Sequence, residues 1–458
     1  MPTDLHSKYD RMKTKPTKRF YIDCTHTYFD RLNDGISRVT RNLIQQSDII
    51  REMGSYEIHP IVFHNDKYYV LSSHEIFKGN PPEKYKISQK SNERLSWCIK
   101  KILSIVSITK KQRKAYRQRL KADRAARIED LFPHPIKPFE ESSLSKDDFL
   151  ILPELCQENQ LTHLIKFKGK LTMAFVIHDL IPITHPEYCG DSILFNRIFK
   201  FAAKNADIII AVSKYSAACF NAYEKLLECS GESLNKKRIT HFHLGHDLCA
   251  IDPPSRPSRE IETIYRTNSP VFLVCGTIEP RKNHDLILNT FNKLWEQRGD
   301  VKLLFIGRYG WNSSHTLLAI TQHPELGKRF FWVPKCTDAD LHYAYQNCHA
   351  LIFASQVEGF GLPLVEALTM GKEVLFSRIK SFQEIIPKEF FINSFDPNKP
   401  EELLDLVVKS LRTRNRLKVD KFKSISWRQS VKEFYRILLT NAGSPPTFQA
   451  KTLKRGRL

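Results

Sequence analysis

The stretch ASQVEGFGLPLVEALTMGKEV, residues 354–374, has the pattern of a strand end, a glycine-containing loop and a helix. Pro363 suits the first turn of that helix, and Gly371 suits the position just past its end. Gly359 and Gly361 lack a Cβ, so the loop backbone can approach a ligand closely. The free amides at the start of the helix favour a phosphate. The stretch predicts a phosphate-binding unit of an α/β fold or, taken alone, a tight turn.

Two carboxylates and two cations accompany this loop. Glu358 precedes the helix and Glu366 lies inside it, so they can accept hydroxyls from the sugar and the ribose of a sugar nucleotide. A second strand-to-helix loop, GTIEPRKNHDL (276–286), places Arg281 and Lys282 at a helix start. Cations are unfavourable at the positive end of a helix, so an anionic ligand would explain them. An exposed basic turn is the alternative.

Short apolar runs of strand length alternate with amphipathic helical segments along most of the chain. Near-continuous apolar runs such as PVFLVCG (270–276) are typical of parallel strands covered by helices on both faces. The proline-rich segment 251–260 marks a linker. Strands are expected at residues 19–24, 56–63, 149–154, 171–180, 207–213, 238–245, 270–276, 301–307, 329–333, 350–355, 373–377 and 390–395. This pattern predicts two doubly wound domains whose loops, including GRYGW (307–311), bind a ligand at the carboxyl ends of the strands.

Composition narrows the class of protein. The 458 residues, 41% hydrophobic and 26% charged, are ordinary for a globular chain of two or three domains. Lys and Arg number 71 against 50 Asp and Glu, and this formal charge of +21 favours an anionic partner. Ten dispersed cysteines without a CxxC pair argue against structural zinc and indicate a reducing compartment. We find neither a signal-peptide pattern nor a run of about 18 apolar residues, so a cytoplasmic location is expected.

One basic segment fits neither domain. Residues 98–127 hold eleven Lys and Arg and one Asp, with Ile99, Ile102, Leu103 and Val106 spaced as one helical face. The segment is compatible with a solvated helical excursion or with an amphipathic helix on anionic lipid. Nucleic-acid binding is the least favoured interpretation, because none of the standard nucleic-acid motifs occurs in the chain.

The second half of the chain resembles the retaining GT-B glycosyltransferases of family 4, a large group that includes many bacterial mannosyltransferases. Glu358 and Glu366 in EGFGLPLVEA match the E-x7-E signature of that family. The string GTIEPRKN matches its diphosphate-binding loop. Thr277 stands where many members carry an arginine, so the resemblance leaves the diphosphate to Arg281 and Lys282.

The resemblance covers about residues 18–440, apart from the basic insertion. DGISRVTRNL (34–43) resembles the first-strand loop of the family, where the Gly35 amide would face the donor diphosphate. VIHDLIP (176–182) resembles the catalytic-histidine segment. His178 is therefore expected to contact the transferred sugar near the reacting carbon.

The resemblance implies an α/β protein with the GT-B fold, in which two Rossmann-like doubly wound domains face each other across a cleft. Its expected parts are an N-terminal acceptor-side domain (18–250) with a basic helical insertion at about 85–148, a C-terminal donor domain (262–412), helices crossing back to the first domain (413–440) and a basic tail (441–458). The implied site combines catalytic His178 and Glu358 with donor-binding Gly35, Thr277, Arg281, Lys282, Arg308, Gly359, Phe360, Gly361, Leu362 and Glu366.

The implied activity is retaining, metal-independent transfer of a hexose from a nucleoside diphosphate sugar, with GDP-mannose favoured. The acceptor would be a hydroxyl of a surface glycan or of a lipid-linked precursor, such as lipopolysaccharide or O-antigen. No cofactor is expected, and Asp338 and Asp340 after Thr337 are interpreted as helix-capping residues rather than metal ligands. The alternatives are a nucleotide-sugar epimerase of the same fold and a non-catalytic basic scaffold that binds membrane or nucleic acid. Contact with the inner face of the cytoplasmic membrane would run through 98–127.

Overall fold

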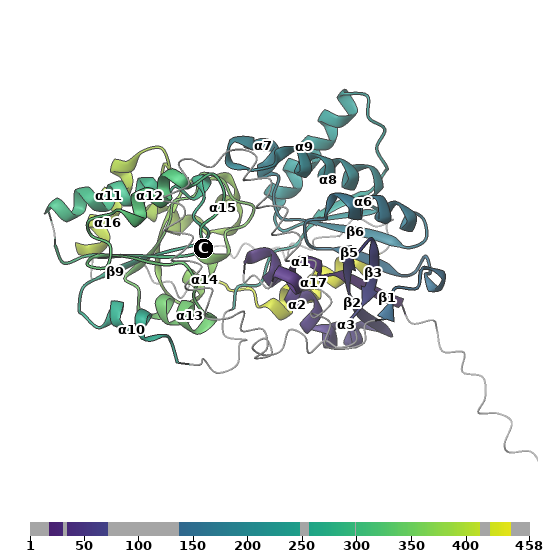
Figure 1. Cartoon of the computed structure of the whole chain (residues 1–458), viewed down its shortest axis with the longest axis horizontal. Helices are drawn as coiled ribbons and strands as arrows, with labels where there is room; N and C mark the ends of the chain where they lie inside the picture. Colours follow the sequence, from purple (N-terminus) through teal and green to yellow (C-terminus); the bar gives the residue numbers. More distant parts are fainter. Residues whose placement is uncertain are drawn as a thin grey trace, which may run out of the picture.

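The computed structural model describes residues 18–30, 34–71, 137–247, 256–297, 299–412 and 422–440. These residues form two α/β domains that lie side by side, each built on its own sheet (Figure 1). The basic segment 98–127 and the tail 441–458 lie outside the described residues, so the predictions made for them stay predictions. Within the described ranges, the helices are too short or too polar for any of them to cross a membrane.

The first domain is built on an eight-stranded sheet with the order β4-β3-β2-β1-β5-β6-β7-β8. Its strands are β1 (Lys18–Asp23), β2 (Tyr56–His64), β3 (Lys67–Val70), β4 (Lys137–Pro138), β5 (Phe149–Leu152), β6 (Thr172–Ile177), β7 (Ile208–Ala211) and β8 (Arg238–His241). Strand β1 runs parallel to both neighbours, with Ile22 opposite Pro60 of β2 and Ile151 of β5. The order of the strands reverses between β1 and β5. The loops after these two strands therefore diverge and leave a crevice.

Helices cover both faces of this sheet. They are α1 (Thr25–Asp30), α2 (Gly35–Gln45), α3 (Ser47–Met53), α6 (Glu158–Leu164), α7 (Ile181–Thr184), α8 (Ser192–Asn205) and α9 (Lys214–Cys229), with 3-10 turns η5 (Glu141–Ser143), η6 (Ile165–Phe167) and η7 (Pro186–Tyr188). Helix α2 begins where the Asp34 carboxylate accepts the Ser37 amide, and it buries Val39 and Leu43. Its first turn therefore lies at the crevice after β1.

The second domain is built on a six-stranded parallel sheet with the order β11-β10-β9-β12-β13-β14. Its strands are β9 (Val271–Cys275), β10 (Lys302–Ile306), β11 (Phe330–Val333), β12 (Ala350–Phe353), β13 (Glu373–Ser377) and β14 (Ser394–Phe395). Strands β9 and β12 are buried along their whole length, as their apolar sequences require. The order of the strands reverses between β9 and β12, so the second crevice opens where the Arg281 and Glu358 loops begin.

The helices of the second domain follow the predicted alternation. They are α10 (Arg259–Tyr265), α11 (His284–Gln297), α12 (Ser314–Thr321), α13 (Asp338–Asn347), α14 (Leu362–Thr369), α15 (Lys380–Ile385) and α16 (Pro400–Arg412), with 3-10 turns η9 (Pro280–Lys282) and η10 (Lys388–Asn393). The Thr337 hydroxyl accepts the Asp340 amide, and the Asp340 carboxylate accepts the Thr337 amide. The capping interpretation is therefore confirmed for Asp340.

The sequence interpretation made one strand too long and missed a hairpin. A strand was expected at residues 390–395, but only Ser394–Phe395 form it as β14, and the 3-10 turn η10 occupies the residues before it, where Phe390 is buried and Ile392 is 58% exposed. Strands β2 and β3 are joined by Asn65 and Asp66, which both have positive φ, as a tight two-residue turn requires. Strand β4 pairs with β3 although it falls within the range predicted as insertion, so the described end of that range belongs to the sheet.

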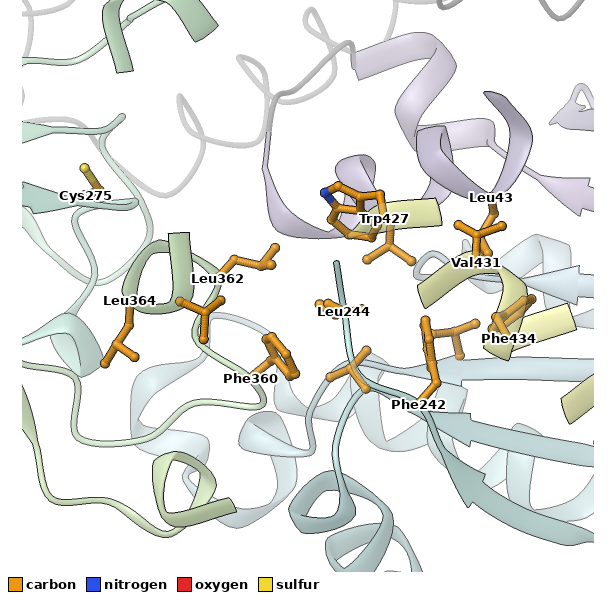
Figure 2. Close-up of a cluster of buried hydrophobic side chains, with 14 of the residues drawn as sticks. Leu43, Phe242, Leu244, Cys275, Phe360, Leu362, Leu364, Trp427, Val431 and Phe434 are labelled. Carbon is orange, nitrogen blue, oxygen red and sulfur yellow. The ribbon is translucent and has the colours of Figure 1, made fainter. Parts of the chain in front are cut away.

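The last described helix, α17 (Trp427–Leu439), joins the two domains. It returns from the second domain and packs among the helices of the first (Figure 1). The Tyr435 hydroxyl donates to the Leu43 carbonyl at 2.8 Å. Figure 2 shows Leu244 between Phe360 on the second domain and Val431 of α17, all in one hydrophobic cluster. This shared core fixes the two crevices opposite each other.

Candidate active site

A cavity of about 700 Å³ lies between the two domains, at the point where their crevices meet. This volume lies within the range of roughly 300–1,000 Å³ that is usual for small-molecule sites. The structure brings together all the residues predicted for the site, since its lining includes Gly35, His178, Thr277, Arg281, Lys282, Arg308, Glu358, Gly359, Phe360, Gly361, Leu362 and Glu366. The residues differ, however, in what they contact.

Glu358 is the centre of a buried charge cluster. Its Oε1 lies 2.5 Å from Lys282 Nζ and 2.9 Å from Arg281 Nη1, and it accepts the Ser355 hydroxyl at 2.7 Å. Burial alone would raise the pKa of Glu358, but the two cations outweigh it and lower the pKa to about 2. The carboxylate is therefore ionised at neutral pH, and it supplies the negative charge that the sequence attributed to a ligand.

The two cations respond differently to this cluster. Burial lowers the pKa of Lys282, and the attraction of Glu358 only partly offsets the effect. Burial also opposes the charge of Arg281, but Glu358, Glu279 and Asp179 outweigh this effect and raise the pKa of Arg281. The Arg281 side chain also donates to Glu279 Oε2 at 2.9 Å. Arg281 is therefore held from two sides, whereas Lys282 keeps ammonium protons that this carboxylate does not use.

Glu366 contacts the first domain directly. Its Oε1 forms an ion pair with Arg38 of α2, and its Oε2 accepts the Tyr345 hydroxyl at 3.1 Å. Burial opposes the charge of Arg38, but the carboxylate of Glu366 outweighs it and raises the pKa of Arg38. The residue predicted to bind the ribose is therefore already paired with a cation from the opposite domain.

His178 follows β6 and lines the cavity. Its Nε2 lies 2.8 Å from the Pro153 carbonyl, which can only accept, so the geometry assigns a proton to Nε2. Burial lowers the pKa of His178, and the ring is neutral at pH 7. With Nε2 occupied, Nδ1 is the ring atom left to accept a hydrogen bond.

The two loop glycines approach protein rather than open space. A Cβ on Gly359 would lie 2.0 Å from the His178 carbonyl oxygen of the first domain. Gly361 has a φ of +99°, and a Cβ there would lie 2.6 Å from the Phe382 ring. The expected close approach of this loop backbone is real, but its partners are His178 and Phe382.

Other predicted residues make the remaining contacts across the cleft. Arg308 Nη2 lies 3.6 Å from Asp34 Oδ2, and half of the Arg308 side chain is exposed. A Cβ on Gly35 would lie 3.4 Å from Leu362 Cδ1, which places the first turn of α2 against the second domain. The loop after β1 therefore meets the loops after β10 and β12.

Sequence reasoning missed several residues of the site, which are Arg38, Glu154, Tyr345 and Ser355. Arg38 lies one helical turn after Gly35 in a loop that had been selected, so helical spacing could have indicated it. Glu154 follows β5 at the switch point of the first domain, where its carboxylate accepts the His26 and Thr27 amides. Burial raises its pKa to about 7. Its position at a strand end was the only available signal.

One group among the described residues has the composition of a metal site. Candidate ligand atoms of His241, His243 and Glu384 all lie within 4.8 Å of one another. Glu384 also accepts the Lys214 and Tyr215 amides at the start of α9. None of the three lines the cavity. Whether the reaction proceeds without metal stays a prediction.

The fold and the cavity define a class of protein, the GT-B proteins, with two doubly wound domains facing each other across a ligand-sized cleft. HepE of Anabaena, solved with UDP and glucose, matches with a TM-score of 0.54 at 12% identity, over 93% of this chain and 100% of that one. The N-terminal domain of trehalose-6-phosphate phosphatase from Candida albicans gives 0.56 at 11% identity, over 93% and 98%. At such low identity these structures establish the fold alone.

Sequence comparison narrows the class. Residues 258–422 match the family described as glycosyl transferases group 1. The serotype-specific mannosyltransferase WbdA of Escherichia coli is 30% identical over 304 residues, which are 65% of this chain and 37% of that protein. The chain thus spans little more than a third of the length of that relative. The resemblance to bacterial GT-B glycosyltransferases of the mannosyltransferase type is confirmed.

Proposed function

We propose that the chain is a retaining glycosyltransferase that moves a hexose from a nucleoside diphosphate sugar to a hydroxyl of a surface glycan or its lipid-linked precursor. The observation that carries the proposal is the cluster of Glu358, Lys282 and Arg281 at the second-domain switch point, opposite His178. The similarity to the mannosyltransferase WbdA favours mannose as the sugar. We propose GDP-mannose as the donor and an O-antigen type of acceptor.

The charge cluster suggests how a donor is held. A diphosphate carries two or more negative charges and would compete with Glu358 for Lys282 and Arg281. The carboxylate of Glu358 would then be free to accept hydroxyls of the transferred sugar. Glu366, held by Arg38 and Tyr345, would accept the ribose hydroxyls. An exchange of partners inside the cluster would therefore couple phosphate binding to recognition of the sugar.

The transfer step needs no nucleophilic side chain. The bond between the anomeric carbon and the leaving phosphate oxygen breaks, and the acceptor oxygen bonds to that carbon on the same face. The proton of the acceptor hydroxyl passes to the departing phosphate oxygen. Lys282 and Arg281 stabilise the charge that grows on the diphosphate. Because these cations serve the leaving group, we propose that no metal ion is needed.

The test is to incubate the purified full chain with a panel of nucleotide sugars and membrane lipid extract, and to identify the product. We expect nucleotide release and a product whose anomeric configuration, read by NMR, matches the donor. Activity should survive EDTA. Lys282→Ala should lower turnover and weaken donor binding together. Interconversion of the donor without acceptor would identify an epimerase, and no release with any donor would favour the non-catalytic scaffold.

Membrane contact is a separate part of the proposal. Residues 98–127, which lie outside the described residues, carry the eleven Lys and Arg that would meet anionic headgroups. Flotation with phosphatidylglycerol vesicles compares the full chain with one that lacks 98–127. Salt-sensitive binding by the full chain alone is expected. Equal binding by both would contradict a membrane role for the segment.

A further inference from the structure

Two aromatic side chains from opposite domains stand at the mouth of the cavity. Tyr188 of η7 and Trp311 in the loop after β10 both line it. Trp311 is 48% exposed, so it presents free surface next to the cavity. The segments that carry them are in contact, since Asn312 Nδ2 donates to the Cys189 carbonyl at 3.3 Å. The mouth is therefore a surface built jointly by the two domains.

The contacts around these rings indicate what could cover them. Glu366 pairs with Arg38, close to Tyr345 and Asp338. Glu358 and Arg281 form a second charged group that lines the same cavity.

A Cβ on Gly310 would lie 2.8 Å from Glu279 Cγ, so the loop that carries Trp311 packs directly on the Arg281–Glu279 pair. With the ribose of the donor at Glu366 and its sugar at Glu358, Trp311 would be available to sugar units next to the transferred sugar.

The chemistry of the mouth fits a carbohydrate. A flat ring offers an apolar surface for the C–H face of a pyranose, and polar groups are needed beside it for the hydroxyls. Polar groups are present on both sides of the rings, because the Tyr188 hydroxyl bonds to Gln356 and the Arg308 guanidinium is half-exposed. A lipid chain would cover these polar groups without offering them a further hydrogen-bond partner.

We propose that Trp311 and Tyr188 form a binding site for the acceptor glycan, in which sugar units that precede the reacting hydroxyl stack on the two rings. The chain would then extend an existing oligosaccharide and would not act on a single sugar. This inference rests on the proposed function, because it takes the position of the donor from it. The nucleobase of the donor is the competing occupant.

The binding test uses isothermal titration of the full chain with a mannose tetrasaccharide and with methyl mannoside. Trp311→Ala should weaken tetrasaccharide binding at least about tenfold, and Trp311→Phe should retain most of it. Tyr309→Ala is the matched control, because Tyr309 lies on the same loop and is 40% exposed but does not line the cavity. It should leave binding unchanged. Tetrasaccharide binding that is absent, or unaffected by Trp311→Ala, would overturn the proposal.

Kinetics separate this inference from the proposed function. With an active donor, Trp311→Ala should raise the KM for the tetrasaccharide and leave the donor KM unchanged. A raised donor KM would identify the nucleobase as the occupant and overturn the proposal. If the tetrasaccharide binds in a Trp311-dependent way but no donor releases its nucleotide, the proposed function fails and the glycan site stands. If transfer proceeds without dependence on Trp311, the glycan site fails alone.

Discussion

The two faces of the cavity are built in different ways. The second-domain face draws its charges from short stretches at one switch point, where Arg281, Lys282 and Glu358 balance one another. The first-domain face uses single residues from separate elements, which are Arg38 in α2, Glu154 after β5 and His178 after β6. The second-domain face is thus a compact electrostatic unit, whereas the first-domain face contributes isolated polar groups. Substitutions on the second-domain face should accordingly have the larger effects.

The largest effect is expected for Glu358→Gln. The variant keeps the size and a hydrogen-bond acceptor but loses the charge that balances Arg281 and Lys282. Turnover should fall by about 10²-fold or more, because the buried carboxylate that would accept the sugar hydroxyls becomes a neutral amide. The thermal midpoint should also fall, since Lys282 loses its counter-charge and Arg281 keeps only its ion pair with Glu279.

Steady-state kinetics and thermal unfolding check both parts. Because the pKa of Glu358 is about 2, wild-type activity should not follow its titration above pH 4 to 5. Near-normal turnover in the variant would contradict the assignment of Glu358.

The second prediction concerns the point where the two faces touch. Gly359→Ala places a methyl group only 2.0 Å from the present position of the His178 carbonyl oxygen. The loop and the strand end must separate, which should cost on the order of 1–3 kcal/mol of stability and shift His178 away from Glu358. Turnover should fall roughly tenfold or more with a smaller change in donor binding.

Gly299→Ala is the control for this substitution. A Cβ there meets only Arg329 Nη1 at 3.8 Å, so the thermal midpoint and turnover should stay near those of the wild type. If the two alanine variants behaved alike, the contact between Gly359 and His178 would not be important for the cavity.

The contrast between the faces also explains what the sequence could predict. The EGFGLPLVEA and GTIEPRKN strings contain the strand end, the turn residues and the charged groups of one face within a few residues of one another. The pairing of Arg38 with Glu366 joins residues more than 300 positions apart, and only the approach of the two domains creates it. No local pattern reports such a contact. The strand expected at 390–395 was predicted too long for a related reason, since an apolar run does not reveal which of its residues pair with a neighbouring strand.

The third prediction tests that distant pair. Arg38→Ala removes the cation beside the buried carboxylate of Glu366, which then keeps only the Tyr345 hydroxyl. The carboxylate should lose its orientation for the ribose, and the donor KM should rise by about tenfold while turnover at saturating donor changes little. Tyr345→Phe removes one neutral hydrogen bond and should raise the KM less.

A double-substitution cycle with Glu366→Gln measures the coupling. The combined variant should be little worse than the worse single variant, because both changes break the same interaction. Additive effects would show that Arg38 acts apart from Glu366.

The smallest effect on activity is expected where the domains are joined, away from both faces. His246 is buried between Thr369 of α14 and the segment that leads into α17. The Ile425 amide donates to His246 Nε2 at 3.1 Å, so Nδ1 carries the proton and donates to the Thr369 hydroxyl at 2.8 Å. This arrangement requires a neutral imidazole. Burial first, and then the charge of nearby His243, lower the pKa of His246 to about 4.

This shift makes stability depend on pH in a definite direction. An unfolded histidine has a pKa of about 6.5, so between pH 6.5 and 4 the unfolded chain binds a proton that the folded chain does not. The contribution of His246 is complete above pH 6.5 and is lost as the pH falls towards 4, with a loss on the order of 2 kcal/mol by pH 5.

Chemical denaturation between pH 7.5 and 4.5 should therefore show a steeper decline in the free energy of unfolding for the wild type than for His246→Gln. Other buried histidines contribute equally to both proteins and cancel in the difference. His315→Gln, at a side chain that is 92% exposed, should follow the wild-type curve. Parallel curves for the wild type and His246→Gln would contradict the assignment of a neutral imidazole at this junction.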